Sequence, residues 1–244
     1  MVSKWAKLRQ DPIGSGRRSW DKLIVGPWRY GRRGDYNASR YWSDRFARHG
    51  RSLRGVGDEG LPCEDNERDY ARSAEIFRAL TSDQGIDFHA GRTLEIGCGA
   101  GFYTRLITNL GADDLTAYDI TDVLFPQLRE EFPKVDFRQG DISTTQIDGT
   151  FDLGVMIDVL QHIVNPDRFR AALRNITDAL APDASFVVGP FVKDTPRHRH
   201  LYYVRHRSTS ELAEALPAWK IAAGVEFRNG RLLVLRRAAS EIAE

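Results

Sequence analysis

The sequence predicts an α/β protein whose parallel sheet is covered by helices on both faces. From Arg92 onward, short apolar runs alternate with amphipathic segments, a rhythm typical of a doubly wound sheet. A glycine-rich turn follows the first of these apolar runs directly, and such a turn lets a ligand lie against bare backbone. Near the end of the chain, Asn229-Gly230 is a strong two-residue turn signal, which predicts a terminal antiparallel hairpin.

The bulk composition excludes several classes of protein. The 244 residues suffice for one large domain, or for one domain with an extension. No apolar run approaches the roughly 18 residues of a membrane-spanning helix, and the N-terminal segment holds basic side chains without an apolar block. Cys63 and Cys98 form no Cys-x-x-Cys pair, which argues against a disulfide framework or a structural zinc site. We therefore expect a cytoplasmic protein without membrane contact or bound metal.

Charge is distributed unevenly along the chain. Residues 1–60 carry fourteen lysines and arginines against six acidic residues, a balance of +8, whereas residues 61–244 carry a balance of −7. A basic segment on an acidic body could guide an anionic substrate, or it could pack against that body and keep the surface soluble. Both explanations stay open at this point.

We expect residues 1–62 to form an extension or lid and residues 63–244 to form the main domain. The first forty residues include several tryptophans and tyrosines, which disordered tails rarely contain, so this segment should dock on the body, a second subunit or a substrate. A short helix with an aromatic face is expected at residues 41–46. Residues 50–62 contain four glycines and a proline, a composition that predicts a flexible connector.

The main domain should begin with a helix at residues 66–80, where apolar side chains recur every three or four positions and Asn66 is the expected cap. The strands of the parallel sheet are expected at residues 93–96, 115–118, 135–138, 151–157 and 184–188. The helices between them are expected at residues 102–110, 123–132 and 166–180. After a helix at 209–216, capped by Ser208 or Thr209, two strands at 219–225 and 231–235 flank the hairpin turn.

Gly97, Gly99 and Gly101 form the turn between the first strand and the next helix. Glycines there allow positive φ angles and a close approach of ligand to backbone. The dinucleotide fingerprint is Gly-x-Gly-x-x-Gly, and here the third glycine comes one position early. Glu95, two residues before the first glycine, would repel a pyrophosphate but would favour a sulfonium and an α-ammonium group. The pattern therefore favours a positively charged ligand over NAD.

Acidic and apolar residues follow the next two strands. Asp119 ends the second strand, where a carboxylate can accept hydrogen bonds from both hydroxyls of a ribose, and Ile120 follows it. After the third strand, Asp141 could meet the amino group of an adenine while Ile142 packs on the base. Together with the glycine turn, these residues predict a site for an adenosine-containing ligand.

These features together resemble class I S-adenosylmethionine-dependent methyltransferases. Residues 95–101 resemble the first motif of that family, Asp119 the second, residues 140–142 the third, and residues 151–157 the strand before the catalytic loop. The resemblance covers about residues 90–238. It implies a Rossmann-like, seven-stranded sheet with one antiparallel strand, S-adenosylmethionine at the carboxyl ends of the strands, and a methyl acceptor above it. The expected cofactor-binding residues are Glu95, Gly97, Gly99, Gly101, Asp119, Ile120, Asp141, Ile142 and Ile157.

The expected catalytic stretch is residues 157–163, just beyond the fourth strand. The resemblance implies that this loop lies beside the transferred methyl group and carries an acid or base. His162 is the best base candidate, because imidazole titrates near neutral pH, and Asp158 could orient it or hold the acceptor. In the alternative, His162 belongs to a surface turn or binds the carboxylate region of the cofactor.

Absent motifs narrow the identity of the acceptor. Residues 157–163 contain no Asn-Pro-Pro-Tyr or Asp-Pro-Pro-Tyr motif, which disfavours methylation of exocyclic base amines, and no Pro-Cys nucleophile, which disfavours methylation at cytosine C5. The basic, aromatic segment at residues 197–207 could enclose a polar acceptor, and residues 7–12 resemble the start of bacterial surface-polysaccharide biosynthesis proteins. We therefore expect O-methylation of a small molecule, glycan or glycan precursor, with homodimer formation left open. An RNA methyltransferase using the basic extension, and a catalytically silent cofactor-binding partner protein, are the alternatives.

Overall fold

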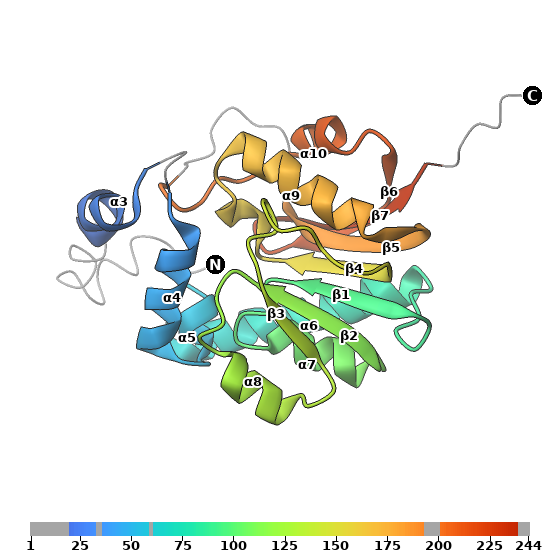
Figure 1. Ribbon diagram of the computed structural model, residues 1–244, viewed down its shortest axis with the longest axis horizontal. Coiled ribbons are helices and arrows are strands. Elements are labelled where there is room, and N and C mark those ends of the chain that lie inside the picture. Colours follow the sequence, from blue (N-terminus) through green and yellow to red (C-terminus); the bar gives the residue numbers. More distant parts are fainter. Residues whose placement is uncertain (1–19, 33–35, 59–60, 193–200, 239–244) are drawn as a thin grey trace, which may run out of the picture.

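A computed structural model describes residues 20–32, 36–58, 61–192 and 201–238. Within them, seven strands form one sheet in the order β3-β2-β1-β4-β5-β7-β6 (Figure 1). The strands are β1 (Arg92–Ile96), β2 (Asp114–Asp119), β3 (Asp136–Gln139), β4 (Phe151–Ile157), β5 (Leu180–Phe191), β6 (Trp219–Phe227) and β7 (Gly230–Arg237). Strands β1 to β5 pair in parallel, whereas β7 runs antiparallel to β5 and β6. The expected sheet with one antiparallel strand is confirmed.

Helices cover both faces of this sheet, as the strand–helix alternation predicts. One face carries α6 (Cys63–Asp83), α7 (Phe102–Asn109) and α8 (Phe125–Glu131), and the other carries α9 (Pro166–Asp178) and α10 (Thr209–Ala215) (Figure 1). Neighbouring residues of one strand enter different halves of the core. Ala117 packs with the first group of helices and Tyr118 with the second, because successive side chains of a strand point to opposite faces.

The N-terminal extension packs on the body through its tyrosines. It contains η1 (Asp21–Val25), α3 (Gly26–Tyr30), α4 (Ala38–His49) and α5 (Leu53–Val56). The Tyr30 hydroxyl donates to Asp44 Oδ2 at 3.0 Å, and the buried Tyr36 ring meets that of Tyr202 with centroids 5.9 Å apart. Trp20 and Trp28 are instead exposed, and Trp5 lies outside the described residues.

One expectation for residues 50–66 is wrong, that of Asn66 as a helix cap, whereas the flexibility of the connector stays a prediction. Helix α6 begins at Cys63 with Pro62 as its N-cap, so Asn66 lies inside the helix. There the buried Asn66 amide accepts from the Asp58 backbone N at 3.2 Å and donates to its carbonyl at 3.1 Å. The described part of the connector is structured, because it holds the turn α5 and because the Arg45 guanidinium donates to two of its carbonyls at 2.6 Å.

The terminal hairpin forms with its turn shifted by one residue. Gly230 pairs with Phe227, so Arg228 and Asn229 form the turn instead of Asn229 and Gly230. Arg228 takes the left-handed conformation with φ 50°. Ahead of the hairpin, the Ser208 side chain and Glu211 form a capping box on α10, which confirms Ser208 as the cap.

Candidate functional site

One cavity lies where the carboxyl ends of β1, β2 and β4 meet α4, α5 and α6. It encloses about 930 Å³ when the part open to solvent is counted. Among the predicted site residues, Gly97, Gly99, Asp119, Ile120, Asp141, Ile142, Ile157, Asp158 and His162 line it. Glu95 and Gly101 do not belong to the lining.

The glycine turn requires glycine for conformation and for space. Gly97, Gly99 and Gly101 have φ angles of 78°, 50° and 84°, in the left-handed region that disfavours other residues. A Cβ on Gly97 would collide with Cγ2 of Val159. Gly101 is the buried N-cap of α7 and does not line the cavity, and its left-handed conformation turns the chain into that helix.

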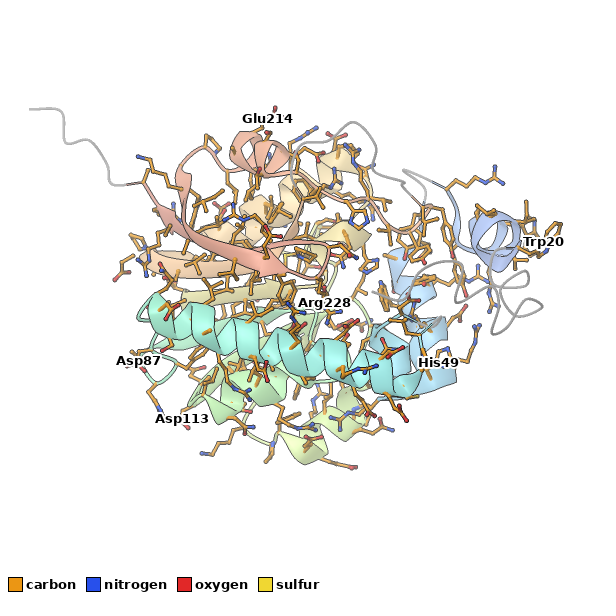
Figure 2. The ribbon with its side chains drawn as sticks, turned by 180° about the vertical axis from the view of Figure 1, so that it is seen from behind. Trp20, His49, Asp87, Asp113, Glu214 and Arg228 are labelled. Carbon is orange, nitrogen blue, oxygen red and sulfur yellow. The ribbon has the colours of Figure 1, made fainter. Side chains whose placement is uncertain are left out.

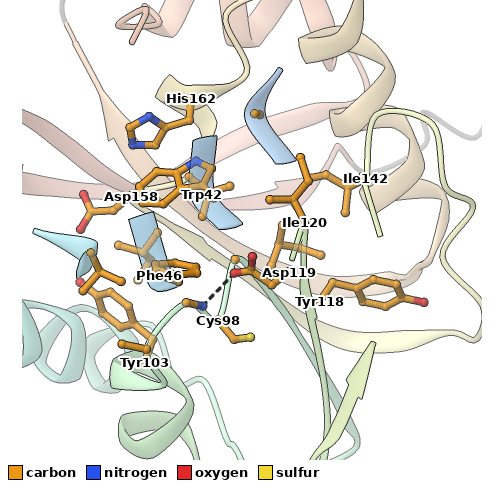
Figure 3. Close-up of a pocket in the computed structure, with 18 of the residues that line it drawn as sticks. Trp42, Phe46, Cys98, Tyr103, Tyr118, Asp119, Ile120, Ile142, Asp158 and His162 are labelled. Atoms are coloured by element: carbon orange, nitrogen blue, oxygen red, sulfur yellow. Dashed lines mark hydrogen bonds between the residues drawn. The ribbon is translucent and has the colours of Figure 1, made fainter. Parts of the chain in front are cut away.

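Asp119 is buried at the end of β2 with both carboxylate oxygens engaged. Oδ2 accepts from the Gly99 backbone N at 2.9 Å (dashed line in Figure 3), and Oδ1 accepts from the Thr121 backbone N at 3.2 Å. Burial raises the pKa of Asp119 to about 6, although hydrogen bonds from the backbone of Gly99, Thr121 and Ile120 oppose that rise. The carboxylate therefore holds the glycine turn in place and faces the cavity as well.

Glu95 lies in β1 beneath the glycine turn. Its Oε2 accepts from the Thr104 hydroxyl at 2.7 Å, and its Oε1 is buried without a hydrogen-bond partner. Burial raises the pKa of Glu95 to about 8, so the group is mainly protonated at neutral pH. Its direct contact with a ligand remains a prediction, whereas its contact with α7 is visible in the structure.

The expected base-binding end of the cavity has two isoleucines and one carboxylate. Figure 3 shows Ile120 and Ile142 next to each other on this side, which makes an apolar slot suited to a flat ring. Asp141 Oδ1 accepts from the Ser143 backbone N at 2.9 Å and from its hydroxyl at 2.6 Å. Arg168 lies 3.4 Å from Oδ2 of Asp141, so this carboxylate is already oriented before a ligand enters.

His162 lines the opposite end of the cavity, where aromatic rings fix its orientation (Figure 3). Its Nδ1 lies 3.0 Å from the Tyr203 carbonyl oxygen. A carbonyl can only accept a hydrogen bond, so Nδ1 carries the proton and Nε2 keeps its lone pair. The ring meets Trp42 edge to face at 4.9 Å. Burial lowers the pKa of His162 to about 4, which keeps the imidazole neutral at physiological pH.

Asp158 lines the same end, but it does not orient His162. It lies directly after β4 with φ 62°, and its Oδ2 is 3.1 Å from Arg228 Nε. Burial raises the pKa of the carboxyl, and the Arg228 charge opposes that rise. The Tyr203 carbonyl therefore fixes the His162 tautomer, and Asp158 pairs with the hairpin instead.

Aromatic residues from the extension and from α6 and α7 close the cavity. Trp42 and Phe46, four positions apart on α4, place their rings on its wall (Figure 3), together with Tyr70 and Tyr103. The aromatic face expected at residues 41–46 was a signal for the first two. Tyr70 and Tyr103 carry no such signal, because the sequence of their helices shows only ordinary apolar periodicity.

The basic segment at residues 197–207 contributes less to the cavity than expected. Its residues 197–200 lie outside the described residues. The fully buried Arg207 donates to the Ile163 carbonyl at 2.6 Å and pairs with Glu211 at 3.1 Å. Arg205 also pairs with Glu211, at 2.8 Å. These two guanidinium groups therefore bind the protein itself.

The described residues contain no cluster of three or more metal-ligating side chains. In the same part of the chain, no helix is long and apolar enough to cross a membrane.

Comparisons with known proteins agree on one class. A family model described as a methyltransferase domain matches residues 93–183. Nodulation protein S of Bradyrhizobium diazoefficiens is 30% identical over 106 residues, which is 42% of this chain and 50% of that protein. A ubiquinone biosynthesis O-methyltransferase of Dechloromonas aromatica is 31% identical over 90 residues, 34% of this chain and 38% of that protein. The chain thus spans about half, or less, of these curated relatives.

Solved structures share the fold over most of their length. A DhpI–SAM–HEP complex superposes with a TM-score of 0.59 at 24% identity, covering 82% of this chain and 95% of that one. The N-methyltransferase NodS from Bradyrhizobium japonicum WM9, in complex with S-adenosyl-l-homocysteine, has a TM-score of 0.58 at 21% identity, covering 79% and 98%.

Proposed function

The chain belongs to the class I S-adenosylmethionine-dependent methyltransferases, and from that premise we propose that it methylates a hydroxyl group of a small molecule or glycan precursor. One observation carries the proposal. The glycine turn, Asp119 and the isoleucine slot share a single cavity with the neutral imidazole of His162, so a cofactor site and a proton acceptor open into the same space.

The residues present fit S-adenosylmethionine. The left-handed glycines give a backbone cradle that a side chain would block, and Asp119 supplies a buried acceptor for ribose hydroxyls. Ile120 and Ile142 would hold the adenine, with Asp141 at its edge. When bound, the cofactor supplies an electrophilic methyl group on a positively charged sulfur. The protein aligns that methyl with the acceptor oxygen for in-line displacement.

His162 supports oxygen as the methylated atom. With the cofactor bound, His162 Nε2 would accept the hydroxyl proton as the acceptor oxygen takes the methyl group from sulfur, and would then release that proton to solvent. The oxygen becomes very acidic as it is alkylated, so an imidazole with a pKa of about 4 can accept this proton. Among the relatives, the one from Dechloromonas aromatica is named an O-methyltransferase and NodS an N-methyltransferase, so the base is what favours oxygen here.

Calorimetric titration tests the cofactor. We expect micromolar binding of S-adenosylmethionine, and Asp119→Ala should weaken it at least about 100-fold, because the variant loses both the carboxylate and its hold on the glycine turn. Asp113→Ala, on the exposed side of the β1–β2 connection, serves as the control. No binding heat with the intact, folded protein would refute the proposal.

A transfer assay tests the chemistry. Labelled methyl groups are offered with small-molecule, glycan and RNA fractions, and labelled products are identified by mass spectrometry. His162→Gln should keep cofactor binding and lower transfer about 100-fold or more, while the exposed His89→Gln leaves it unchanged. Label appearing in RNA alone would favour the RNA alternative, and a binding-competent protein without any product would favour the silent partner.

A further inference from the structure

A partly buried ion pair joins two unusual backbone positions at the acceptor end of the cavity. Asp158 and Arg228, with φ 62° and 50°, are the non-glycine residues with positive φ in the described chain. Their side chains are only 21% and 24% exposed, and Nε of Arg228 lies 3.1 Å from Oδ2 of Asp158. Such conformations persist where the surroundings enforce them, and they concentrate at functional sites.

The hairpin turn and the rings of Tyr70 and Phe227 hold Arg228 next to Asp158. Figure 2 shows Arg228 at the end of the β6–β7 hairpin, next to α6. The guanidinium lies 4.6 Å from the ring centre of Tyr70 and 5.7 Å from that of Phe227. Asp158, Tyr70 and Tyr103 line the cavity, whereas Arg228 is not part of the lining. The arginine therefore acts on the cavity through Asp158.

The two charges are matched. Burial alone would lower the pKa of Arg228, but Asp158, Tyr70 and Tyr103 together raise it. Burial raises the pKa of Tyr70 to about 12, and the neighbouring Asp158 charge adds to that rise. Burial and the Asp158 charge likewise raise the pKa of Tyr103. Both hydroxyls thus stay neutral at physiological pH, and the ion pair as a whole has no net charge.

Asp158 lies close to the glycine turn, because its chain neighbour Val159 packs directly over Gly97. Resting on the proposed function, we propose that Arg228 is a positioning residue: it holds the Asp158 carboxylate at the cavity wall and cancels its charge towards the sulfonium of S-adenosylmethionine. A bare carboxylate at this place would bind the cationic cofactor more tightly than its neutral product, S-adenosylhomocysteine. An unpaired guanidinium would instead weaken the binding of the cationic cofactor relative to that of the neutral product. The pair thus sets the preference between substrate and product forms.

The test measures the ratio of dissociation constants for S-adenosylhomocysteine and S-adenosylmethionine by calorimetry, without any acceptor. Arg228→Met should raise the preference for S-adenosylmethionine about tenfold, and Asp158→Asn should lower it about tenfold. The double variant should return close to the wild-type ratio, because both charges are gone. Arg228→Lys, which keeps the charge, should also stay close to wild type.

The pH dependence of this ratio distinguishes an effect of the Asp158 charge from an effect of the altered side-chain shape. In Arg228→Met, the ratio should increase with pH as the unpaired Asp158 ionises beside the neutral hydroxyls of Tyr70 and Tyr103, because burial raises the pKa of this carboxyl and Arg228 no longer opposes that rise. The wild-type ratio should change less with pH. Arg231→Met is the matched control, since this arginine of the same hairpin donates to the Gly224 carbonyl at 2.9 Å and is not part of the cavity lining.

Two outcomes would overturn different claims. If wild type binds both ligands but Arg228→Met and Asp158→Asn keep its ratio within twofold, the positioning role of Arg228 is wrong. Should Arg228→Met fail to fold, Asp158→Asn and Arg228→Lys decide the matter, since the first must lower the ratio and the second must not. If wild type binds neither ligand, the proposed function itself fails.

Discussion

Asp119 combines two tasks in one buried carboxylate: it accepts a hydrogen bond from Gly99 N, and it faces the cavity. Its pKa of about 6 lies within the working range of pH. Protonation removes an acceptor that the ribose hydroxyls and the glycine turn both need. Ligand binding should therefore depend on pH near this value.

We expect the affinity for S-adenosylhomocysteine to fall as the pH decreases below about 6, by up to about tenfold per pH unit. Asp119→Asn should bind weakly at every pH and lose this dependence, because it has no proton to gain. Calorimetry between pH 5 and pH 8 measures both, with Asp113→Asn as control. An unchanged affinity at pH 5 would contradict the assignment of Asp119.

Glu95 should affect stability rather than binding alone. Its pKa rises from 4.5 to about 8 on folding. Between those values the folded state holds a proton that the unfolded state has released, so stability decreases as the pH rises, by up to about 1.4 kcal/mol per unit. Glu95→Gln should lose this contribution and keep the decrease at lower pH that comes from the raised pKa of Asp119, about 6. Urea unfolding from pH 5 to pH 8 measures it, and Glu75→Gln on the exposed side of α6 should keep the wild-type slope.

At the scale of elements, the turn between β1 and α7 depends on glycine for two separable reasons. Gly97 has a positive φ, and a Cβ there would also strike Val159, whereas Gly85 has a positive φ of 63° with nothing within 4 Å of its Cβ position. Comparing alanine substitutions at these two positions therefore distinguishes the effect of backbone strain from the effect of a steric collision.

Gly97→Ala should abolish cofactor binding and lower the free energy of unfolding by about 2–4 kcal/mol, since strain and collision add. Gly85→Ala should lower it by only about 1 kcal/mol and leave binding intact. Thermal unfolding and calorimetry of both variants check this. Equal effects of the two substitutions would mean that the contact with Val159 is not important.

For the whole molecule, Arg51 joins the extension to the body. It pairs with Glu131 of α8 at 2.6 Å, and it donates to the carbonyls of Ala100 and Gln127 at 3.3 Å each. Ser43 and Thr121 add a hydrogen bond of 2.8 Å between α4 and the segment after β2. These contacts hold Trp42, Phe46 and Val56 over the cavity.

Arg51→Met should therefore loosen the extension without unfolding the sheet. We expect faster hydrogen exchange across residues 38–57 and a several-fold weaker affinity for S-adenosylhomocysteine, because the aromatic wall is no longer held in place. Lys134→Met, which loses only a long, exposed ion pair at 4.0 Å, should change neither. Unaltered exchange in Arg51→Met would show that the extension does not depend on this arginine.

The sequence by itself determined the parts of this protein that depend on local chemistry. The left-handed glycines, the Ser208 capping box and the strand–helix alternation each follow from conformational preferences within a few residues. The hairpin was predicted in the same way, but its turn was misplaced by one residue, and Asn66 was taken for a cap although it binds Asp58 inside α6. Short-range sequence signals predict the existence of a helix or strand more reliably than they predict its first and last residues.

Only the tertiary structure decided which side chains meet at the cavity. It brought Glu95 to Thr104 of α7 and left Gly101 outside the cavity lining. It also placed the Tyr203 carbonyl where it fixes the tautomer of His162, and it paired Asp158 with Arg228 from the hairpin. His162 and Tyr203 are 41 positions apart in the sequence, and Asp158 follows β4 whereas Arg228 lies in the β6–β7 turn, so only the folded chain brings these pairs together. Burial, which sets the pKa values of these groups, likewise depends on packing across the whole molecule and leaves no mark on the local sequence.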